Sequence, residues 1–174
     1  MGLKMGEPYH LVRPTLEQHE VAVFSSNYGL YGDMSRRVMQ VLSGFSPQVE
    51  VYSIDEAFLH LPGLRYTAPD LRDYALLIRD TVQRHVGIPT CVGVAPTKTM
   101  AKLANRLARR QPIGERAVVL TTPAECAVAL SQTAVQDVWG IGRRYAAKLR
   151  ESGIMTAADL AAQPEGWIRR QPGA

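Results

Sequence analysis

The chain has 174 residues, of which 46% are hydrophobic, 21% are charged and 7% are aromatic, and its formal net charge is +4. This length and composition indicate one globular domain with a true core, or one domain and a small satellite. No apolar run approaches the roughly 18 residues of a membrane span, and the N-terminus lacks the basic start and apolar core of a signal peptide. These features argue against a membrane or secreted protein and indicate a cytoplasmic one.

Charge is distributed unevenly along the chain. Residues 1–94 carry 8 Lys and Arg against 10 Asp and Glu, whereas residues 95–174 carry 12 against 6. A basic half beside an acid-bearing half is typical of a protein that handles a polyanion and has a metal site, although a merely soluble basic surface would have the same charge. Cys91 and Cys126 are too few for a disulfide framework and are expected to be reduced thiols.

Hydrophobic periodicity and turn residues predict the elements in chain order. They are a short helix within 11–18, a strand at 20–25, a helix from Tyr28 to Gly44, antiparallel strands at about 48–53 and 57–61 that end at Pro62 and Gly63, a helix capped by Thr67 that ends at Gly87, a strand at 90–95, a helix from Thr97, an edge or linking strand at 117–120, and helices at 123–130, 135–139, 143–152 and 156–162. Residues 167–174 are expected to trail off without closing a unit. This order predicts an α+β fold with helices packed on one face of a mainly antiparallel sheet.

Two adjacent carboxylates, Asp55 and Glu56, lie inside an otherwise apolar, β-prone run from Val49 to Leu61. An unpaired charge among such residues is strongly unfavourable, so a cation is expected to meet the pair. Along a continuous strand the two side chains would point to opposite faces, and both can reach one ion only if the chain reverses near 54–56. The pattern predicts a Mg²⁺ site at a hairpin tip, and a solvated hairpin tip is the alternative.

The helix that starts near Thr97 carries a row of cations. Lys98, Lys102 and Arg106 recur at intervals of four residues and therefore line up on one face. No acid follows them before Glu115, which excludes salt bridges within the helix and favours a surface that faces phosphates. Lys98 lies in the first turn, where a helix already favours anions. A solvated basic face is the alternative.

A Gly-Ile-Gly sequence at 140–142 interrupts the helical pattern of 135–153. Two glycines around one aliphatic residue allow a tight reversal with exposed backbone N–H groups. The residues that would together hold a backbone phosphate, without reading any base, are Gly140, Ile141, Gly142, Arg143 and Arg144. The segment resembles the helix-hairpin-helix of non-sequence-specific DNA-binding proteins. A plain helix-turn-helix packing element is the alternative.

Three segments in a fixed order carry a wider resemblance. They are Tyr-Ser-Ile-Asp-Glu-Ala-Phe at 52–58, Gly-Val-Ala-Pro-Thr-Lys-Thr-Met-Ala-Lys-Leu-Ala-Asn at 93–105, and Val-Trp-Gly-Ile-Gly-Arg-Arg at 138–144. Together they resemble the Y-family translesion DNA polymerases. The segments at 24–28 and 30–35 favour the UmuC branch, which is the catalytic-subunit type of bacterial DNA polymerase V. The resemblance covers nearly the whole chain, and three motifs in this order are specific.

The resemblance implies an error-prone translesion polymerase that acts in DNA repair and the SOS response. Asp55 and Glu56 match carboxylates that bind two Mg²⁺ ions, which assist attack by the primer 3′-hydroxyl and neutralise the leaving pyrophosphate. Lys98 matches the lysine that contacts the incoming deoxynucleoside triphosphate. The implied fold is an incomplete ferredoxin-like palm with a small helical thumb. The implied partners are primer-template DNA, a UmuD-type subunit, a sliding clamp and a recombinase filament.

The same resemblance divides the chain into the end of the fingers at 1–23, a partial palm at 24–105 and a thumb at 106–174, with the helix-hairpin-helix at 135–153. Family members have a further metal-binding aspartate on an earlier strand, an aromatic gate against ribonucleotides and a little-finger domain, and none of these has a counterpart in the 174 residues. We therefore expect poor polymerase activity from this chain alone, weak non-specific DNA binding and marginal stability.

Two alternatives come from other functional classes. A non-enzymatic DNA-binding remnant would use only the basic helix and the Gly-Ile-Gly hairpin. A nucleotidyl cyclase, or another metal-dependent enzyme on a similar palm, would use the carboxylates, although a small-molecule cyclase has no need of groups that grip duplex DNA.

Overall fold

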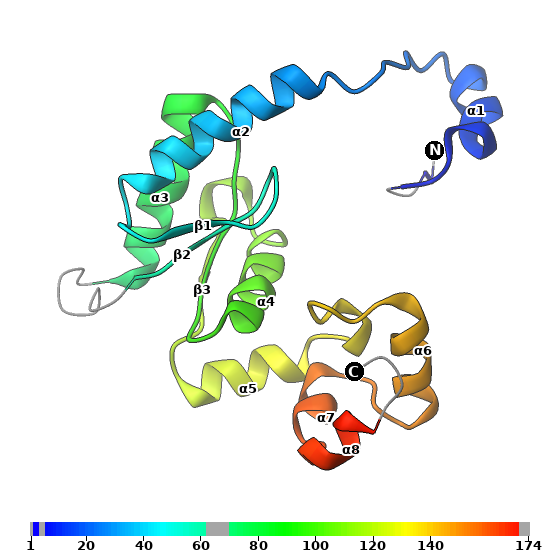
Figure 1. The fold of residues 1–174 in the computed structure, drawn as a ribbon, viewed down its shortest axis with the longest axis vertical. Coiled ribbons are helices and arrows are strands. Elements are labelled where there is room, and N and C mark those ends of the chain that lie inside the picture. The colour runs from blue at the N-terminus through cyan, green and yellow to red at the C-terminus, as the bar shows by residue number, and fades with distance from the viewer. Residues whose placement is uncertain (1, 4–5, 62–69, 171–174) are drawn as a thin grey trace.

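The computed structural model describes residues 2–3, 6–61 and 70–170 (Figure 1). The helices are α1 (Tyr9–Gln18), α2 (Tyr28–Ser43), α3 (Leu71–Val86), α4 (Lys98–Ala108), α5 (Pro123–Ser131), α6 (Arg143–Glu151), α7 (Ala157–Ala161) and α8 (Glu165–Arg169), with 3₁₀ turns η2 (Ile113–Glu115) and η3 (Val135–Asp137). The strands are β1 (Val49–Val51), β2 (Ala57–Leu59), β3 (Val92–Val94) and β4 (Ala117–Val119). The predicted mixture of helices and strands is confirmed. None of the described helices is long and apolar enough to cross a lipid bilayer.

The N-terminal helix α1 lies apart from the rest of the described chain, and an extended segment joins it to α2 (Figure 1). The helix predicted within 11–18 is present and begins at Tyr9. The strand predicted at 20–25 is wrong, because no described strand pairs with this segment and Glu20 has a left-handed φ of 53°. A β-prone sequence forms a strand only where a neighbouring strand satisfies its backbone groups.

The strands form two separate pairs among the described residues. β1 and β2 are antiparallel, with Glu50 opposite Phe58, whereas β3 and β4 are parallel, with Gly93 opposite Val118. The predicted hairpin is therefore confirmed, but the predicted single, mainly antiparallel sheet is wrong. The chain leaves β3 through helix α4 before it reaches β4, and such a crossover brings the second strand back parallel to the first.

The β3–β4 pair lies between α3 and α4, and α2 packs against α3 (Figure 1). The predicted apolar stripes supply the buried contacts. The fully or nearly buried residues of this part are Ala75, Ile78 and Val82 on α3, Leu103, Ala104 and Ala108 on α4, Ala117 and Leu120 around β4, and Ala129 on α5. Asn105 of α4 also donates a hydrogen bond to the carbonyl of Cys91 at 2.6 Å, which ties the helix to the start of β3. Cys91 and Cys126 are free thiols, as predicted.

Helix α3 begins later than the sequence predicts. Asp70 is its N-cap and accepts a hydrogen bond from the backbone N–H of Arg72 at 2.7 Å. An aspartate next to the first turn therefore provides the cap in place of the threonine that was expected. That threonine, Thr67, lies outside the described residues, and so do Pro62 and Gly63, which were predicted to end the hairpin.

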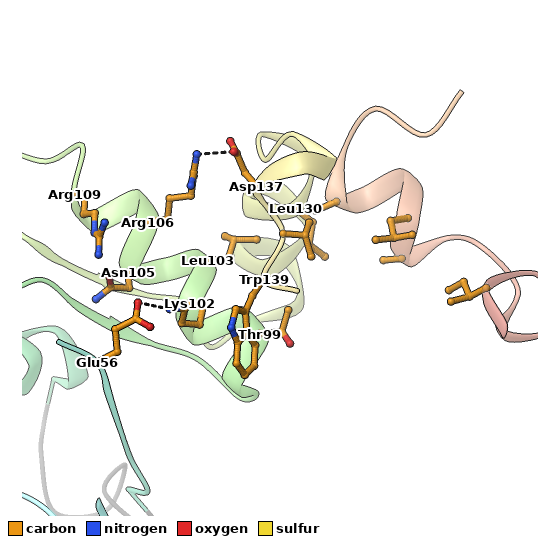
Figure 2. Close-up of a pocket in the computed structure, with 15 residues that line it drawn as sticks. Glu56, Thr99, Lys102, Leu103, Asn105, Arg106, Arg109, Leu130, Asp137 and Trp139 are labelled. Atoms are coloured by element: carbon orange, nitrogen blue, oxygen red, sulfur yellow. Dashed lines mark hydrogen bonds and ion pairs between the residues drawn. The ribbon is translucent and has the colours of Figure 1, made fainter. Parts of the chain in front are cut away.

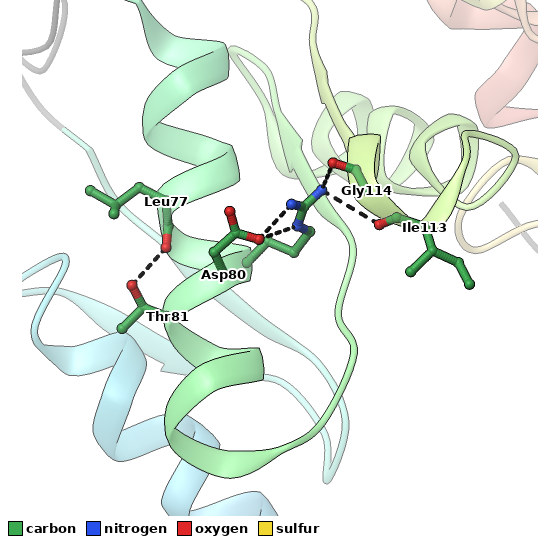
Figure 3. A network of polar contacts seen from close by, with 6 residues as sticks. Leu77, Asp80, Thr81, Ile113 and Gly114 are labelled. Atoms are coloured by element: carbon green, nitrogen blue, oxygen red, sulfur yellow. Dashed lines mark hydrogen bonds and ion pairs between the residues drawn. The ribbon is translucent and has the colours of Figure 1, made fainter.

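Arg79 of α3 forms hydrogen bonds to the 3₁₀ turn η2, whose residues Ile113 and Gly114 are labelled in Figure 3. Its guanidinium donates hydrogen bonds to the carbonyl oxygens of Ile113, at 3.5 Å, and Gly114, and it forms an ion pair with Asp80. Only 12% of the Arg79 side chain is exposed, so these acceptors satisfy a charge that is largely removed from water. The contact fixes the connection that leads from α4 into β4.

A second apolar cluster lies in the C-terminal helices. Val135, Leu149 and Ile154 are at most 3% exposed, and Trp167 packs against them. Trp167 belongs to α8, so the expectation that 167–174 trail off is wrong for the described residues up to 170. A helix of five residues has too few turns to give a periodic pattern, and packing rather than helix propensity stabilises it.

Two capping boxes fix the starts of α5 and α7. They pair Thr122 with Glu125 and Thr156 with Asp159. Hydrogen bonds from the backbone N–H groups of Thr122 and Thr121 hold the pKa of Glu125 below its ordinary value. The backbone N–H and the hydroxyl of Thr156 lower the pKa of Asp159 in the same way. The start of α7 at Thr156 agrees with the predicted cap.

Candidate functional site

The two adjacent carboxylates lie at the turn between β1 and β2. The backbone N–H groups of Tyr52 and Ser53 donate to the carbonyl of Glu56 at 2.9 and 3.0 Å, so the chain reverses between 52 and 56. Asp55 is exposed, and its Oδ1 accepts a hydrogen bond from Ser53 Oγ at 2.7 Å. The chain reversal that the sequence predicts around the acidic pair is confirmed.

The first turns of α4 face this hairpin. Thr97 caps the helix by accepting a hydrogen bond from the backbone N–H of Met100 at 3.3 Å. Lys98 then forms an ion pair with Glu50 of β1. Lys102, one turn further, forms an ion pair with Glu56 at the hairpin turn (Figure 2). One acid of the pair, Glu56, therefore meets a lysine of the predicted basic row, whereas Asp55 accepts a hydrogen bond from Ser53.

Arg106, the third cation of the row, contacts a different part of the chain. Its Nη2 lies 2.6 Å from Oδ1 of Asp137 in η3, so the ion pair joins α4 to the C-terminal helices (Figure 2). All three cations of the row thus meet an acid from another element. The partners Glu50 and Asp137 were not predicted, because helical spacing shows which residues share a face but not which element packs across it.

Three aromatic rings surround the ends of the carboxylate turn. The ring centroid of Trp139 is 5.3 Å from that of Tyr52 and 5.7 Å from that of Phe58, and Tyr52 and Phe58 are 5.8 Å apart. Nζ of Lys98 lies 5.3 Å from the centroid of Phe58, and Nζ of Lys102 lies 5.7 Å from that of Tyr52. These distances fall within the range of favourable cation–π contacts. The sequence offers no signal that places Trp139 beside the turn.

The predicted metal and nucleotide residues line one groove. Its volume is about 1490 Å³, and Asp55, Glu56, Lys98 and Lys102 all contribute to its wall. The rest of the wall comes mainly from α2, α3, β2 and β3 and is largely apolar. Carboxylate oxygens and ammonium groups in one groove can bind a divalent cation together with a phosphate.

Asp55 and Glu56 fit Mg²⁺ in ligand type, because hard oxygen donors are what this ion prefers. Within the described ranges, no three His, Cys, Asp or Glu side chains gather closely enough to hold a metal ion. A cation at the turn would therefore take its other ligands from water or from phosphate, as Mg²⁺ usually does. Glu56 would also have to exchange Lys102 for the ion.

The Gly-Ile-Gly segment forms a tight turn before α6. Gly140 has a left-handed φ of 89°, and the N–H of Ile141 donates to the carbonyl of Val138 at 3.0 Å. Gly142 is the N-cap and supplies no side-chain acceptor for the first turn of the helix. The helix predicted at 135–139 is wrong, since only the single 3₁₀ turn η3 forms there.

Arg143 and Arg144 begin helix α6 and are both exposed. Neither forms an ion pair within the part of the chain that the structure describes, in contrast to the three cations of α4. Exposed, unneutralised arginines beside the N-terminus of a helix are compatible with a phosphate contact.

Residues 1–106 of the chain match the impB/mucB/samB family. Protein UmuC of Salmonella typhimurium is 44% identical over 172 residues, which cover 98% of this chain and 40% of that protein. Protein MucB of Escherichia coli is 41% identical, with coverages of 99% and 41%, and DNA polymerase IV of Dehalococcoides mccartyi is 32% identical, with coverages of 99% and 43%. The chain therefore spans about two fifths of the length of these curated relatives.

Solved structures give the same picture of the fold. DinB from Sulfolobus solfataricus superposes with a TM-score of 0.74 at 24% identity, over 99% of this chain and 49% of that one. An insertion ternary complex of Dbh DNA polymerase also has a TM-score of 0.74 at 24% identity, over 97% and 47%. The family match covers 106 of 174 residues, and relatives align along nearly the whole chain. The chain belongs to the impB/mucB/samB family.

Proposed function

We propose that this chain supplies three parts of a translesion DNA polymerase, which performs template-directed nucleotidyl transfer. They are the carboxylates Asp55 and Glu56, the triphosphate-binding helix α4 and the Gly-Ile-Gly turn that would grip duplex DNA. The observation that carries the proposal is the groove in which Asp55 and Glu56 lie with Lys98 and Lys102. The relative named DNA polymerase IV and the likeness to Dbh DNA polymerase support this reaction class. They do not favour the alternative of a non-enzymatic DNA-binding remnant.

Asp55 and Glu56 are the proposed ligands of Mg²⁺. When bound, two such ions would activate the primer 3′-hydroxyl and neutralise charge on the leaving pyrophosphate. The hydrogen bond from Ser53 Oγ to Asp55 Oδ1 at 2.7 Å orients this carboxylate at the turn. The backbone contacts from Tyr52 and Ser53 to Glu56 hold the second carboxylate close to the first.

Lys98 is the proposed contact for the incoming deoxynucleoside triphosphate, and Lys102 lies one turn along the same face. Before substrate binds, the two ammonium groups hold Glu50 and Glu56. A phosphate would compete with these carboxylates for the lysines. The cost of releasing Lys98 from Glu50 is modest, because this pair is exposed and an exposed ion pair contributes only about 0.2–1 kcal/mol. The ion pairs therefore keep the charged groups inside the groove without blocking it.

Duplex DNA is proposed to bind through the backbone N–H groups of the Gly-Ile-Gly turn and the first turn of α6. The residues that would contact phosphates there are Gly140, Ile141, Gly142, Arg143 and Arg144, and Lys102 and Arg106 would add contacts from α4. Because phosphates lack sequence information, this grip would be independent of base sequence.

The division into the end of the fingers at 1–23, palm at 24–105 and thumb at 106–174 is part of the proposal. We also propose, from the likeness of the chain to the UmuC branch, that it acts in the SOS response. The proposed partners are a UmuD-type subunit, a sliding clamp and a recombinase filament.

Paramagnetic Mn²⁺ tests the metal site directly. In the ¹⁵N-labelled chain, we expect Mn²⁺ to broaden the amide signals of 53–57 most strongly. Asp55→Asn combined with Glu56→Gln should remove the effect, while Glu151→Gln on α6 should leave it unchanged. Added deoxynucleoside triphosphate should tighten Mn²⁺ binding in the unmodified chain but not in Lys98→Ala. Broadening centred elsewhere, or insensitive to the double substitution, would contradict the metal site.

Primer extension tests the reaction itself. The unmodified chain is incubated with primer-template DNA, Mg²⁺ and the four deoxynucleoside triphosphates, and incorporation is compared with that of Asp55→Asn. Template-directed incorporation that disappears in Asp55→Asn would establish catalysis by this chain. Incorporation that survives in Asp55→Asn would refute the proposed role of the carboxylate.

A further inference from the structure

Trp139 bridges two parts of the molecule that are distant in the sequence. It follows η3 in the C-terminal region, yet its ring contacts Tyr52 and Phe58 of the hairpin at centroid distances of 5.3 and 5.7 Å. Tyr52 precedes the carboxylate turn and Phe58 follows it, so one indole contacts both ends of the turn. The Trp139–Tyr52 rings are inclined at 78°, which is a favourable edge-to-face geometry.

The same rings contact the lysines of the groove. Lys98 lies over Phe58 and Lys102 over Tyr52, and each lysine also pairs with an acid of the hairpin. A displacement of either ring would therefore remove a contact from a lysine that faces the carboxylates. Through these two rings, the position of Trp139 therefore affects four charged side chains. They are Lys98, Lys102, Glu50 and Glu56.

The C-terminal helices also pack on α5 through α7, and α5 in turn packs on α4, so further described contacts add to this support. One of these contacts is the ion pair between Arg106 of α4 and Asp137, which lies two residues before Trp139 in the chain. Between this pair and the aromatic rings lies a cavity of about 460 Å³, whose wall includes Glu56, Lys102, Leu103 and Leu130 (Figure 2). An interface with a cavity is not closely packed, so its geometry depends on the contacts at its margin. Besides the packing on α5, those contacts are the ion pair and the three rings.

We infer that Trp139 is a positioning residue, which fixes the orientation of the helical region 135–170 relative to the carboxylate turn. The consequence is that Arg143 and Arg144 act together with Lys102 and Arg106 as one surface toward a single nucleic-acid backbone. This consequence rests on the proposed function, whereas the orientation itself does not. A tryptophan that only fills space would stabilise the fold without setting this orientation.

Residual dipolar couplings test the orientation in the full chain. In the unmodified protein, amide vectors of 71–119 and of 135–169 should fit one alignment tensor. In Trp139→Ala the two parts should require different tensors, while chemical shifts inside each part stay close to the original. Trp139→Phe keeps an aromatic ring and should restore the single tensor. Tyr28→Ala, at a ring that is 83% exposed, is the control and should change nothing.

A second variant covers the case in which Trp139→Ala does not fold. Tyr52→Leu removes the hairpin side of the contact at a residue that is 49% exposed, and it should release the orientation in the same way. One unchanged tensor in Tyr52→Leu, and in Trp139→Ala where that variant folds, would overturn the inference.

Salt-dependent DNA binding tests the functional consequence. We expect Trp139→Ala to bind a primer-template duplex about tenfold more weakly, because two phosphate-binding surfaces held in register bind more tightly than two independent ones. The slope of log affinity against log salt should also become shallower, and Trp139→Phe should restore both values. If the unmodified chain binds no DNA, the proposed function fails, and the dipolar couplings still decide the role of Trp139. Unchanged DNA affinity and slope in a variant with released orientation would refute the joint surface.

Discussion

Lys102 neutralises Glu56 at the carboxylate turn when no ligand is bound. Its ion pair with Glu56 is more buried than the neighbouring pair of Lys98 and Glu50, since its side chains are 24% and 30% exposed instead of 50% and 54%. Shielding from water strengthens the attraction between the charges. A cation that binds the turn must therefore compete with Lys102 more than with any other described residue.

Replacing Lys102 by methionine should strengthen metal binding at the turn. The substitution keeps an unbranched side chain that is only one atom shorter and removes the competing charge, so we expect about tenfold tighter Mn²⁺ binding, equivalent to about 1.4 kcal/mol. Isothermal titration calorimetry of the chain with Mn²⁺ measures the change. Lys148→Met, an equal loss of charge at an exposed position of α6, is the matched control. Weaker Mn²⁺ binding in Lys102→Met would mean that Lys102 holds Glu56 in place for the metal.

Strand β3 and helix α4 approach each other so closely at Gly93 that no side chain fits between them. A Cβ placed there would lie 2.3 Å from the backbone nitrogen of Asn105 and 2.4 Å from the carbonyl oxygen of Ala101. Both contacts are to backbone, which cannot move without displacing the helix. This close approach sets the distance between β3 and the lysines of α4.

Gly93→Ala should therefore destabilise the chain and move α4. We expect a loss of about 1–3 kcal/mol in the free energy of unfolding, the usual range for overpacking. Urea unfolding monitored by circular dichroism gives the value. Gly114→Ala is the control, because its Cβ would meet no atom within 4 Å and its backbone needs no left-handed conformation. Equal stabilities of the two variants would contradict the close packing at Gly93.

The capping boxes of α5 and α7 should make stability depend on pH. The pKa values of Glu125 and Asp159 are lowered in the folded chain, so the unfolded chain binds more protons once the pH falls into the ordinary carboxyl range, about pH 4. Their contribution is present above that range and is lost as the pH falls through the folded pKa values. We expect Tm to fall with pH there, and less steeply in Glu125→Gln and Asp159→Asn. Circular dichroism at several pH values gives Tm for the unmodified chain, the two variants and the control Glu151→Gln. Four parallel curves of Tm against pH would contradict this prediction.

Periodicity and caps were sufficient to predict most elements, whereas contacts between elements were not predictable. The spacing of apolar residues located α3 and α4, and the chemistry of two adjacent acids required a chain reversal at 54–56, which the structure contains. The partners Glu50 and Asp137 and the ring of Trp139 reach the site only through tertiary packing. The parallel pairing of β3 and β4 was missed for the same reason. A pattern along the chain describes faces, and packing decides which faces meet.

At the scale of the whole molecule, the cations of α4 are neutralised by ion pairs, whereas those at the start of α6 have no such partner among the described residues. The cations of α4 meet acids of other elements, whereas Arg143 and Arg144 are exposed and have no ion-pair partner among the described residues. An arginine without an ion-pair partner can neutralise a phosphate, and so release its counterions, without breaking an ion pair within the protein. In the proposed DNA complex, the electrostatic part of binding should therefore depend more on Arg143 and Arg144 than on Lys98, Lys102 and Arg106.

Arg143→Ala combined with Arg144→Ala should lower the dependence of DNA binding on salt. If each arginine neutralises one phosphate, the slope of log affinity against log salt should become shallower by about 1.8, because each contact contributes about 0.9. Fluorescence anisotropy with a labelled duplex at several salt concentrations measures the slope. Arg36→Ala combined with Arg37→Ala removes the same charge from two arginines that already pair with Asp33 on α2, and it should leave the slope nearly unchanged. Equal effects of the two double substitutions would show that DNA responds only to net charge, and the start of α6 would then have no special role.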